Sequence, residues 1–485
     1  MNNDLLHHAY DPEQFRQQGH QLIDRLADYL TQMQQEPHLA VLPWQSPEDK
    51  LYSWEADFDN SPQQNINQFF DRVLMESIHI HHPRYVGHQV SAPAPAAALA
   101  GLLSAFLNNG MAVYEMGPVS SAIERLVMKQ IAHRIGYDTS GGGIMNSGGT
   151  LANLTAVLAA RQIKTGHTTW QQGTHEQLAL MVSEEAHYCV DRAVKIMGWG
   201  EAGIIRIPVN ENYQMRTDQL EPYFQRAEQD GKKVIAVVAS ACSTSTGSYD
   251  NLEEIASFCR QHDLWLHVDG AHGAAAAFSE KYQSRVSGLS LADSITLDFH
   301  KMLMTPALTT GLLFKNESDS FATFSQQASY LLNEDEEDWA NSGKRTVECT
   351  KRMMSVQVYT LLRTYGWKLW DENVTLLYDL AQRFAQLIRE RPELTLAINP
   401  QANILCFRYA PSDVPDNLLS QLNAKIRQNM LEDGRFYMVQ TQLKKEIFLR
   451  VTLMNPFTTE SILSDLLDEI IRNGKELNFF YDRSS

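Results

Sequence analysis

The sequence has little cysteine and no segment typical of a secreted or membrane-spanning protein. Its five cysteines are scattered over 485 residues without a C-x-x-C pair, which excludes a disulfide scaffold and a thiolate zinc site. The N-terminus lacks the basic start and apolar core of a signal peptide, so we expect a cytoplasmic protein. The longest apolar stretch, residues 92–107, contains prolines and is shorter than the roughly 20 residues that a membrane-spanning helix needs. We interpret it as a buried helix, which a subunit interface could also cover.

Positive charge is also scarce. Lys and Arg total 41 against 58 Asp and Glu, which gives a formal net charge of −17. Such a charge repels the phosphates of nucleic acids and anionic membranes, so we expect neither as a partner and favour a small-molecule substrate. Histidines cluster at His79, His81 and His82, but no nearby Cys or carboxylate completes a metal site, and we expect no metal.

Short apolar runs alternate with helical segments in the middle of the chain. Continuous apolar runs bounded by polar or Gly residues are typical of buried parallel strands. The runs lie at 178–182, 234–239, 264–268, 294–297 and 311–314. In open parallel sheets ligands bind beyond the carboxyl ends of the strands, so the residues that follow these runs are candidates for chemistry.

The segments on either side of these runs have different patterns of apolar residues. Apolar residues at helical spacing predict a helix over 14–35, followed by a proline-containing stretch. Beyond residue 366 the sequence changes to long amphipathic helices and shorter strands. We therefore predict a helical arm and entry segment (1–95), a large α/β domain (96–365) and a small C-terminal α+β domain (366–485).

A glycine-rich turn at Ser147-Gly148-Gly149-Thr150 opens directly into a predicted helix. Backbone N–H groups, the helix dipole and hydroxyl groups converge there, which suits a phosphate. A tight turn with an ordinary Ser or Thr cap would produce the same pattern.

Two further residues follow predicted strands. Asp269 ends one run and precedes small residues, and a buried carboxylate there would need a cationic partner such as a protonated pyridine nitrogen. Asp269 could also simply cap the next helix. Lys301 follows the neighbouring run, and an amine at that edge can bond covalently to an aldehyde if it is desolvated or held neutral, although most lysines only solvate the surface.

A phosphate turn, a pyridinium partner and a reactive lysine on one sheet are what pyridoxal phosphate requires. Over about residues 65–460 the chain resembles the group II pyridoxal-phosphate-dependent amino acid decarboxylases, the family of glutamate, cysteine-sulfinate, aromatic and diaminobutyrate decarboxylases. The resemblance implies an α/β fold of type I, like aspartate aminotransferase, with a large mostly parallel sheet domain and a smaller C-terminal α+β domain. It also implies a homodimer with shared active sites, which an alanine-rich helix at 96–107 would allow.

The same resemblance assigns site residues. The catalytic residues would be Lys301, which bonds to the aldehyde, Asp269, which pairs with the ring nitrogen, and His187, which stacks on the ring face. The residues expected to bind the cofactor are Ser147, Gly148, Gly149, Thr150, His187, Asp269, Ala271, His300 and Lys301. The residues expected to bind the substrate are His82, Tyr85, His88 and Arg450.

The implied activity is α-decarboxylation of an L-amino acid to CO2 and a primary amine. The segments Tyr114-Glu115-Met116 and His300-Lys301-Met302 are similar to the branch that acts on acidic substrates, so glutamate, aspartate or cysteine sulfinate is favoured. His88 stands where that branch reads the distal acid with an amide pair; a protonated His88 would suit an acidic side chain, and a neutral one an aromatic or polar side chain.

Other readings stay open. The substrate could be an aromatic or diamino acid, the fold could carry an aminotransferase or lyase, or the chain could be a non-catalytic homologue that binds the cofactor. Many family members donate the final proton from a loop tyrosine. The corresponding loop here, about 330–345, has only Tyr330 before the acidic run 334–338, so His187 or His300 could take that role.

Overall fold

The chain forms two compact units in a computed structural model that describes residues 4–36, 38–60, 65–166, 169–324 and 338–481. The central unit comprises Gln89–Ala385 and Ile398–Leu405. The terminal unit combines both ends of the chain and comprises Met1–His88, Gln386–Ala397 and Cys406–Ser485. These units divide the chain at points other than residues 95 and 365, and the three-segment division stays a prediction.

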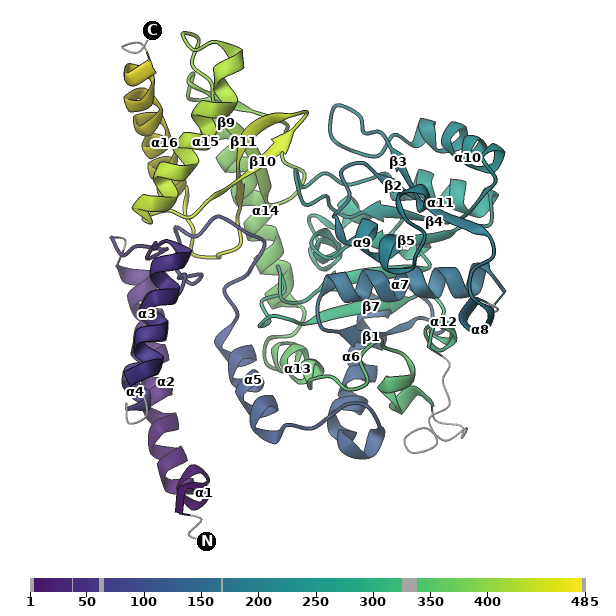
Figure 1. Ribbon diagram of the computed structural model, residues 1–485, viewed down its shortest axis with the longest axis horizontal. Coiled ribbons are helices and arrows are strands. Elements are labelled where there is room, and N and C mark those ends of the chain that lie inside the picture. Colours follow the sequence, from purple (N-terminus) through teal and green to yellow (C-terminus); the bar gives the residue numbers. More distant parts are fainter. Residues whose placement is uncertain (1–3, 37, 61–64, 167–168, 325–337, 482–485) are drawn as a thin grey trace. The chain divides into compact units, whose positions relative to one another are not determined.

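The central unit is built on a seven-stranded sheet, which confirms the predicted α/β class with a mostly parallel sheet (Figure 1). In spatial order the strands are β1 (Gly142–Asn146), β7 (Thr310–Phe314), β6 (Ser294–Asp298), β5 (Trp265–Asp269), β4 (Lys232–Ser240), β2 (Gln177–Ser183) and β3 (Ile204–Ile207). The neighbours from β6 through β5, β4 and β2 to β3 pair in parallel. Their carboxyl ends therefore share one edge of the sheet.

The predicted parallel direction of the run at 311–314 is wrong. Strand β7 is antiparallel to both β6 and β1. Residues 299–309 alone connect β6 to β7, and a parallel pair needs a crossover connection of about a dozen residues or more, usually with a helix. Strands β1 and β3 were not among the apolar runs; β1, with the sequence GGIMN, lacks the β-branched enrichment that marks a strand.

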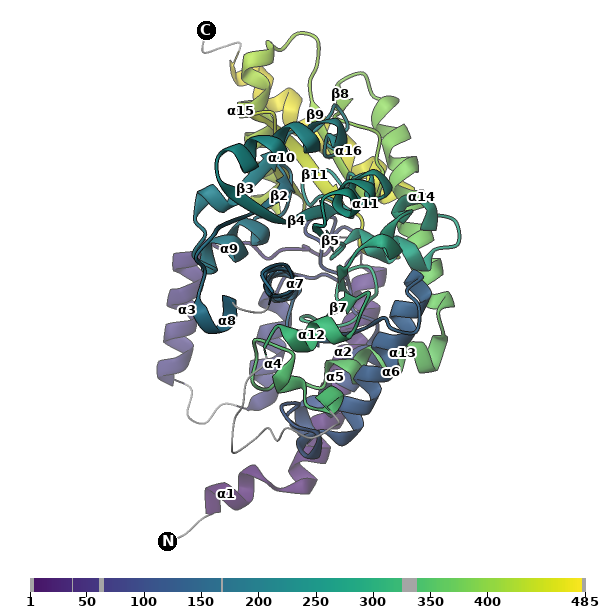
Figure 2. The same ribbon diagram turned by 90° about the vertical axis from the view of Figure 1, so that its right-hand side faces the viewer.

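Helices cover this sheet and place the glycine-rich turn. The helices of the central unit are α5 (Pro95–Leu107), α6 (Pro118–Ile135), α7 (Gly149–Lys164), α8 (Thr169–Gln172), α9 (Cys189–Ile196), α10 (Leu220–Gln229), α11 (Leu252–Gln261), α12 (Ser318–Ala322) and α13 (Met354–Tyr365), with α14 (Lys368–Arg389) continuing into the terminal unit. Helix α7, seen nearly end-on in Figure 2, packs on five strands of the sheet. Its buried alanines permit this close approach, and Leu178, Leu180 and Val182 of β2 belong to the same core.

The terminal unit has an α+β character. Its sheet has the order β10 (Val439–Leu443), β11 (Glu446–Thr452), β9 (Ile404–Tyr409) and β8 (Leu394–Leu396). Its helices are α1 (Asp4–Ala9), α2 (Pro12–Gln35), α3 (Pro47–Asn60), α4 (Ile66–Glu76), α15 (Asp416–Asp433) and α16 (Glu460–Tyr481). Helix α15 packs on β10 and β11 and against α16. None of the helices in the described ranges is long and apolar enough to cross a membrane.

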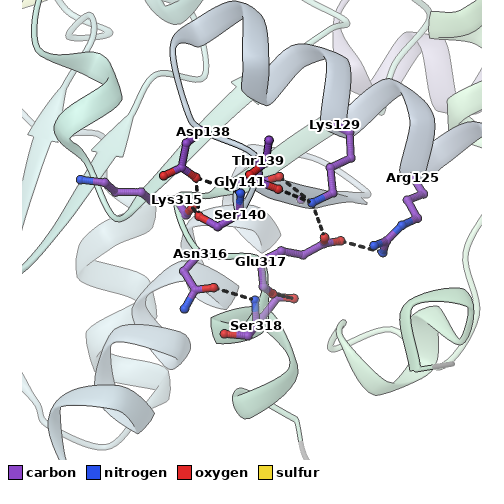
Figure 3. A network of polar contacts seen from close by, with 12 residues as sticks. Arg125, Lys129, Asp138, Thr139, Ser140, Gly141, Lys315, Asn316, Glu317 and Ser318 are labelled. Atoms are coloured by element: carbon purple, nitrogen blue, oxygen red, sulfur yellow. Dashed lines mark hydrogen bonds and ion pairs between the residues drawn. The ribbon is translucent and has the colours of Figure 1, made fainter. Parts of the chain in front are cut away.

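A buried carboxylate, Glu317, pairs with two cationic side chains of α6, Arg125 and Lys129 (Figure 3). Its Oε1 lies 3.1 Å from a guanidinium nitrogen of Arg125 and 3.3 Å from one of Arg345, and its Oε2 lies 2.8 Å from Lys129 Nζ. Lys129 Nζ also donates to the carbonyl of Gly141 at 2.8 Å. Burial lowers the pKa of Arg345 to about 10, although the carboxylate of Glu317 opposes this shift. Glu317 therefore pairs with three cations at this end of the sheet.

Replacing Glu317 should destabilise the protein. Glu317→Gln removes the carboxylate that pairs with the buried Arg345, so we expect the free energy of unfolding to fall by about 3 kcal/mol, measured by urea denaturation. The control is Glu176→Gln, which breaks an exposed pair with Lys233 and should cost at most about 1 kcal/mol. Equal stabilities of the two variants would contradict this role of Glu317.

Candidate active site

The carboxyl ends of β4, β5 and β6 and the turn before α7 surround a cavity of about 330 Å3. Every residue predicted to bind the cofactor lines it: Ser147, Gly148, Gly149, Thr150, His187, Asp269, Ala271, His300 and Lys301. The cavity walls also contain residues that the sequence did not single out: Asn153, Cys189, Ser240, Cys242, Ser243, Thr244, His272, Asp298 and Leu308. The predicted cofactor residues are thus brought together from four separate segments of the chain.

The glycine-rich turn has the backbone that its sequence predicts. Gly148 has a φ of 104°, in the region that favours glycine, and no described side chain caps the first turn of α7. A Cβ atom at Gly149 would lie 3.2 Å from both carboxylate oxygens of Asp298 and 3.5 Å from the Cβ of Ala271. Glycine therefore lets the start of α7 approach the strand ends, with its first N–H groups available to an anion.

Lys301 lies beside a carboxylate that the sequence analysis overlooked. Its Nζ is 3.0 Å from Oδ2 of Asp298, the last residue of β6, and Thr310 Oγ1 donates to Oδ1 of the same carboxylate at 2.5 Å. Burial lowers the pKa of Lys301, but the charges of Asp298 and Asp269 outweigh it and the net direction is upward. Burial raises the pKa of Asp298, but Lys301 and then His300 outweigh it and the net direction is downward. The two groups form an ion pair at the cavity wall, with Asp298 buried and Lys301 partly buried.

The second carboxylate, Asp269, ends β5 at the cavity wall. Its Oδ2 accepts a hydrogen bond from Asn153 Nδ2 at 2.9 Å, and its Oδ1 accepts one from the backbone N–H of Ala271 at 3.2 Å. Asp269 is only partly buried, so the carboxylate both receives protein donors and faces the cavity. This arrangement suits a cationic ring nitrogen.

Two of the histidines at the cavity wall, His187 and His300, contact the backbone through Nδ1. The backbone N–H of Cys189 donates to His187 Nδ1 at 3.3 Å, and burial is the main cause that lowers the pKa of His187. His187 is therefore a neutral imidazole at physiological pH. His300 Nδ1 lies 2.9 Å from the carbonyl oxygen of Thr309, and its Nε2 lies 3.7 Å from Asp298 Oδ2.

The predicted substrate residues His82, Tyr85, His88 and Arg450 all lie in the terminal unit. His82 is buried, and its Nδ1 accepts a hydrogen bond from the backbone N–H of Arg84 at 3.1 Å. Tyr85 stacks on Tyr437 with ring centroids 5.4 Å apart. Burial lowers the pKa of His88, and Arg450 and Arg427 lower it further. The structure thus favours the neutral form of His88.

Two other features of the sequence are the loop that contains Tyr330 and the histidine cluster that begins at His79. Tyr330 and the acidic residues 334–337 lie outside the described residues. Among the described residues, no three His, Cys, Asp or Glu side chains are placed to hold a metal ion. In the cluster that begins at His79, the ring nitrogen Nδ1 of His79 lies 2.9 Å from the hydroxyl of Tyr29.

Comparison with known proteins identifies the class. Residues 47–410 match the pyridoxal-dependent decarboxylase conserved domain. An aromatic-L-amino-acid decarboxylase from Bacillus atrophaeus is 26% identical over 476 residues, which cover 97% of each chain. The acidic amino acid decarboxylase GADL1 of Xenopus tropicalis is 27% identical over 453 residues, 90% of this chain and 88% of the relative. The crystal structure of mouse CSAD has the same fold, with a TM-score of 0.88 at 24% identity over 96% of this chain and 99% of that chain.

The cavity fits pyridoxal phosphate on its own geometry. A glycine turn at a helix start, a carboxylate with a free side facing the cavity, and a lysine amine line one space of suitable volume. The names of the relatives differ in substrate, so they establish the reaction class and not the amino acid. Because the pyridoxal-dependent decarboxylase domain covers most of its length, the chain belongs to the group II pyridoxal-phosphate-dependent amino acid decarboxylases.

Proposed function

We propose that this chain removes the α-carboxyl group of an acidic L-amino acid and releases CO2 and a primary amine. The observation that carries the proposal is the placement of Lys301, Asp269 and the glycine-rich turn on one cavity. When bound, pyridoxal phosphate supplies an aldehyde that bonds to amines and a ring that accepts the electrons released when the carboxyl group leaves. The protein supplies binding, orientation and control of protons.

Each predicted residue has a distinct task in this proposal. The turn at 147–150 and the start of α7 bind the phosphate group through backbone N–H groups. Asp269 holds the ring nitrogen in its protonated form. His187, neutral and at the cavity wall, stacks on the ring without placing a second positive charge beside it.

Asp298 controls the reactivity of Lys301. The amine bonds to an aldehyde only in its neutral form, and the raised pKa of Lys301 keeps it charged at neutral pH in the cofactor-free protein. Lys301 must therefore lose a proton before it captures the cofactor. Asp298 Oδ2, at 3.0 Å, holds that proton on the amine and so sets the pH at which capture becomes fast.

Positive charge in the terminal unit supports an acidic substrate. The positive charges of Arg450 and Arg427 both lower the pKa of His88, so the neutral imidazole lies in a region of positive charge. A guanidinium pairs with a carboxylate in planar, two-point geometry. The acidic preference thus depends on the arginines and not on a charged His88.

The aromatic alternative has its own support. Tyr85 and Tyr437 stack in the same unit, and the ring of His88 lies 5.9 Å from that of Tyr437. A neutral imidazole beside two tyrosines would favour an aromatic side chain. A CO2-release assay on both substrate classes distinguishes the two.

A homodimer is proposed from the exposed face of α5. Its buried face contains Ala97, Ala100 and Ser104, whereas the opposite face exposes Leu99, Leu102, Leu103, Phe106 and Leu107. A contiguous apolar face of this kind is typical of a protein–protein interface. A second copy of the chain is the proposed occupant, as in the dimers of the family.

We expect CO2 release to be fastest with glutamate, aspartate or cysteine sulfinate in a panel that also contains tryptophan, tyrosine and 2,4-diaminobutyrate. Lys301→Ala should reduce the rate by at least about a thousandfold, because the covalent site is lost. Lys233→Ala, at an exposed lysine, is the matched control and should keep full activity. Wild-type turnover by Lys301→Ala would contradict the proposed reaction; faster turnover of aromatic acids would replace the proposed substrate.

Capture of the cofactor by the cofactor-free protein should speed up as the pH rises, because neutral Lys301 is the reactive form. Asp298→Asn removes the larger of the two charges that raise the pKa of Lys301, so we expect faster capture at neutral pH, by about tenfold for each pKa unit. Stopped-flow absorbance of the bound cofactor measures both. Asp191→Asn, which removes an exposed partner of Arg206, is the control. A pH profile unchanged by Asp298→Asn would disprove this role.

The charged variants Leu103→Glu and Phe106→Glu should convert the proposed dimer to a chain of 55.0 kDa, measured by light scattering after gel filtration. The reason is that burying an unpaired carboxylate in an apolar interface is strongly unfavourable. Ile196→Glu, at an exposed apolar residue of α9, is the control. Variants that keep the mass of the wild-type assembly would show that α5 is not the interface.

A further inference from the structure

Behind Asp269 lies a buried row of polar side chains that begins with Asn153 at the cavity wall. Asn153 of α7 contacts Asp269, and its amide oxygen lies 2.8 Å from Nε2 of His267 on β5. Nδ1 of His267 lies 2.9 Å from the hydroxyl of Ser294 on β6. The indole nitrogen of Trp265 donates to the same hydroxyl at 2.9 Å. All four side chains behind the carboxylate are buried.

The proton positions in this row follow from the chemistry of its members. The amide nitrogen of Asn153 must face Asp269, because an amide oxygen against a carboxylate would be repulsive. The amide oxygen then faces His267, so Nε2 of His267 must carry the hydrogen. Thr296 Oγ1 donates to the same amide oxygen at 2.7 Å and supports this orientation.

The rest of the row is then determined. Burial lowers the pKa of His267 to about 4, so its ring is neutral and Nδ1 has no hydrogen when Nε2 has one. Nδ1 therefore accepts a hydrogen bond from the hydroxyl of Ser294. That hydroxyl accepts in turn from Trp265, whose indole nitrogen is a donor only.

Every hydrogen bond in the row donates toward Asp269. Aligned hydrogen bonds polarise one another, so their effects add at the carboxylate. The direction cannot reverse, because the indole of Trp265 has no acceptor and the amide nitrogen of Asn153 can only donate. The thiol of Cys189, 4.0 Å from Asp269 Oδ2, adds no negative charge, since burial raises its pKa to about 12.

We propose that Asn153, His267 and Ser294 are positioning residues, a one-way hydrogen-bond chain that keeps Asp269 negatively charged and so keeps the proton of the proposed ion pair on the cofactor ring. This inference rests on the proposed pairing of Asp269 with the ring nitrogen. His267 and Ser294 act on the site through Asn153 and Asp269, because neither of them is among the residues that line the cavity. It explains why a histidine and a serine are buried inside the sheet.

The test uses holoprotein loaded with pyridoxal phosphate that carries nitrogen-15 in the ring, because the chemical shift of this nitrogen reports its protonation directly. In the wild type we expect a protonated ring. Asn153→Leu removes the last donor and should move the shift toward the unprotonated form. It should also weaken cofactor binding by about tenfold or more, as measured by equilibrium titration.

Variants further along the hydrogen-bond chain, at increasing distance from Asp269, should have progressively smaller effects on the nitrogen-15 shift. His267→Phe should change the nitrogen-15 shift less than Asn153→Leu does, and Ser294→Ala should change it less than His267→Phe. His267→Gln keeps a hydrogen-bond donor toward Asn153 and should therefore show the wild-type shift. Thr155→Val is the control, because the hydroxyl of this buried α7 residue donates only within its own helix, to the carbonyl of Leu151. If these residues had a purely structural role, the variants would lower the stability of the protein, but the nitrogen-15 chemical shift of the ring would not change in this graded order.

Each outcome decides between explanations. A wild-type ring shift in both Asn153→Leu and His267→Phe overturns the inference, and a shift in Asn153→Leu alone reduces the chain to a single hydrogen bond and also overturns it. If His267→Phe does not fold, Ser294→Ala, which removes only a hydroxyl group, gives the same comparison. An unprotonated ring in the wild type, or no covalent link to Lys301 after borohydride reduction, would instead disprove the proposed function.

Discussion

The register between β5 and β6 is the constraint on which the site depends. It pairs His267 with Ser294 and Asp269 with Thr296, so the two strand-end carboxylates, Asp269 and Asp298, are held at fixed positions on one edge. A slip of one residue would turn each side chain of a strand to the opposite face of the sheet. The carboxylate at the cavity, its hydrogen-bond chain and the ion pair of Lys301 would all be lost together.

The two carboxylates have opposite surroundings and therefore different chemistry. Asp298 is buried against an amine and a hydroxyl, so its charge is already compensated within the protein. Asp269 receives only neutral donors from Asn153 and the backbone, so its charge is left for a ligand. The protein thus reserves one negative charge for the cofactor ring and uses the other to restrain the lysine. The two aspartate side chains are chemically identical, and their different roles come from the groups around them.

The sequence could predict the parts of this site that are local. Apolar runs located five of the seven strands of the large sheet, and the residues that follow them, such as Asp269 and Lys301, were expected at one edge because parallel strands end there. The antiparallel direction of β7 was missed because an apolar run indicates a buried strand but not whether the strand pairs in parallel or antiparallel. Asp298 was missed because a polar residue at the end of a strand looks like an ordinary turn residue. Asn153 and His267 meet across 114 positions of sequence, and only the folded register brings them together.

The terminal unit is assembled from the two ends of the chain, and this has a consequence for synthesis. The backbone N–H of Val41 donates to the carbonyl of Gly434 at 2.8 Å, and that of Thr452 to the carbonyl of Val86 at 2.8 Å. Residues before 89 therefore leave the ribosome long before their partners beyond residue 405 exist. At translation rates of about 5–20 residues per second the delay is on the order of tens of seconds. During that time the amphipathic N-terminal helices have no native neighbours from the C-terminal part, so a chaperone or a nascent sister chain would meet them first.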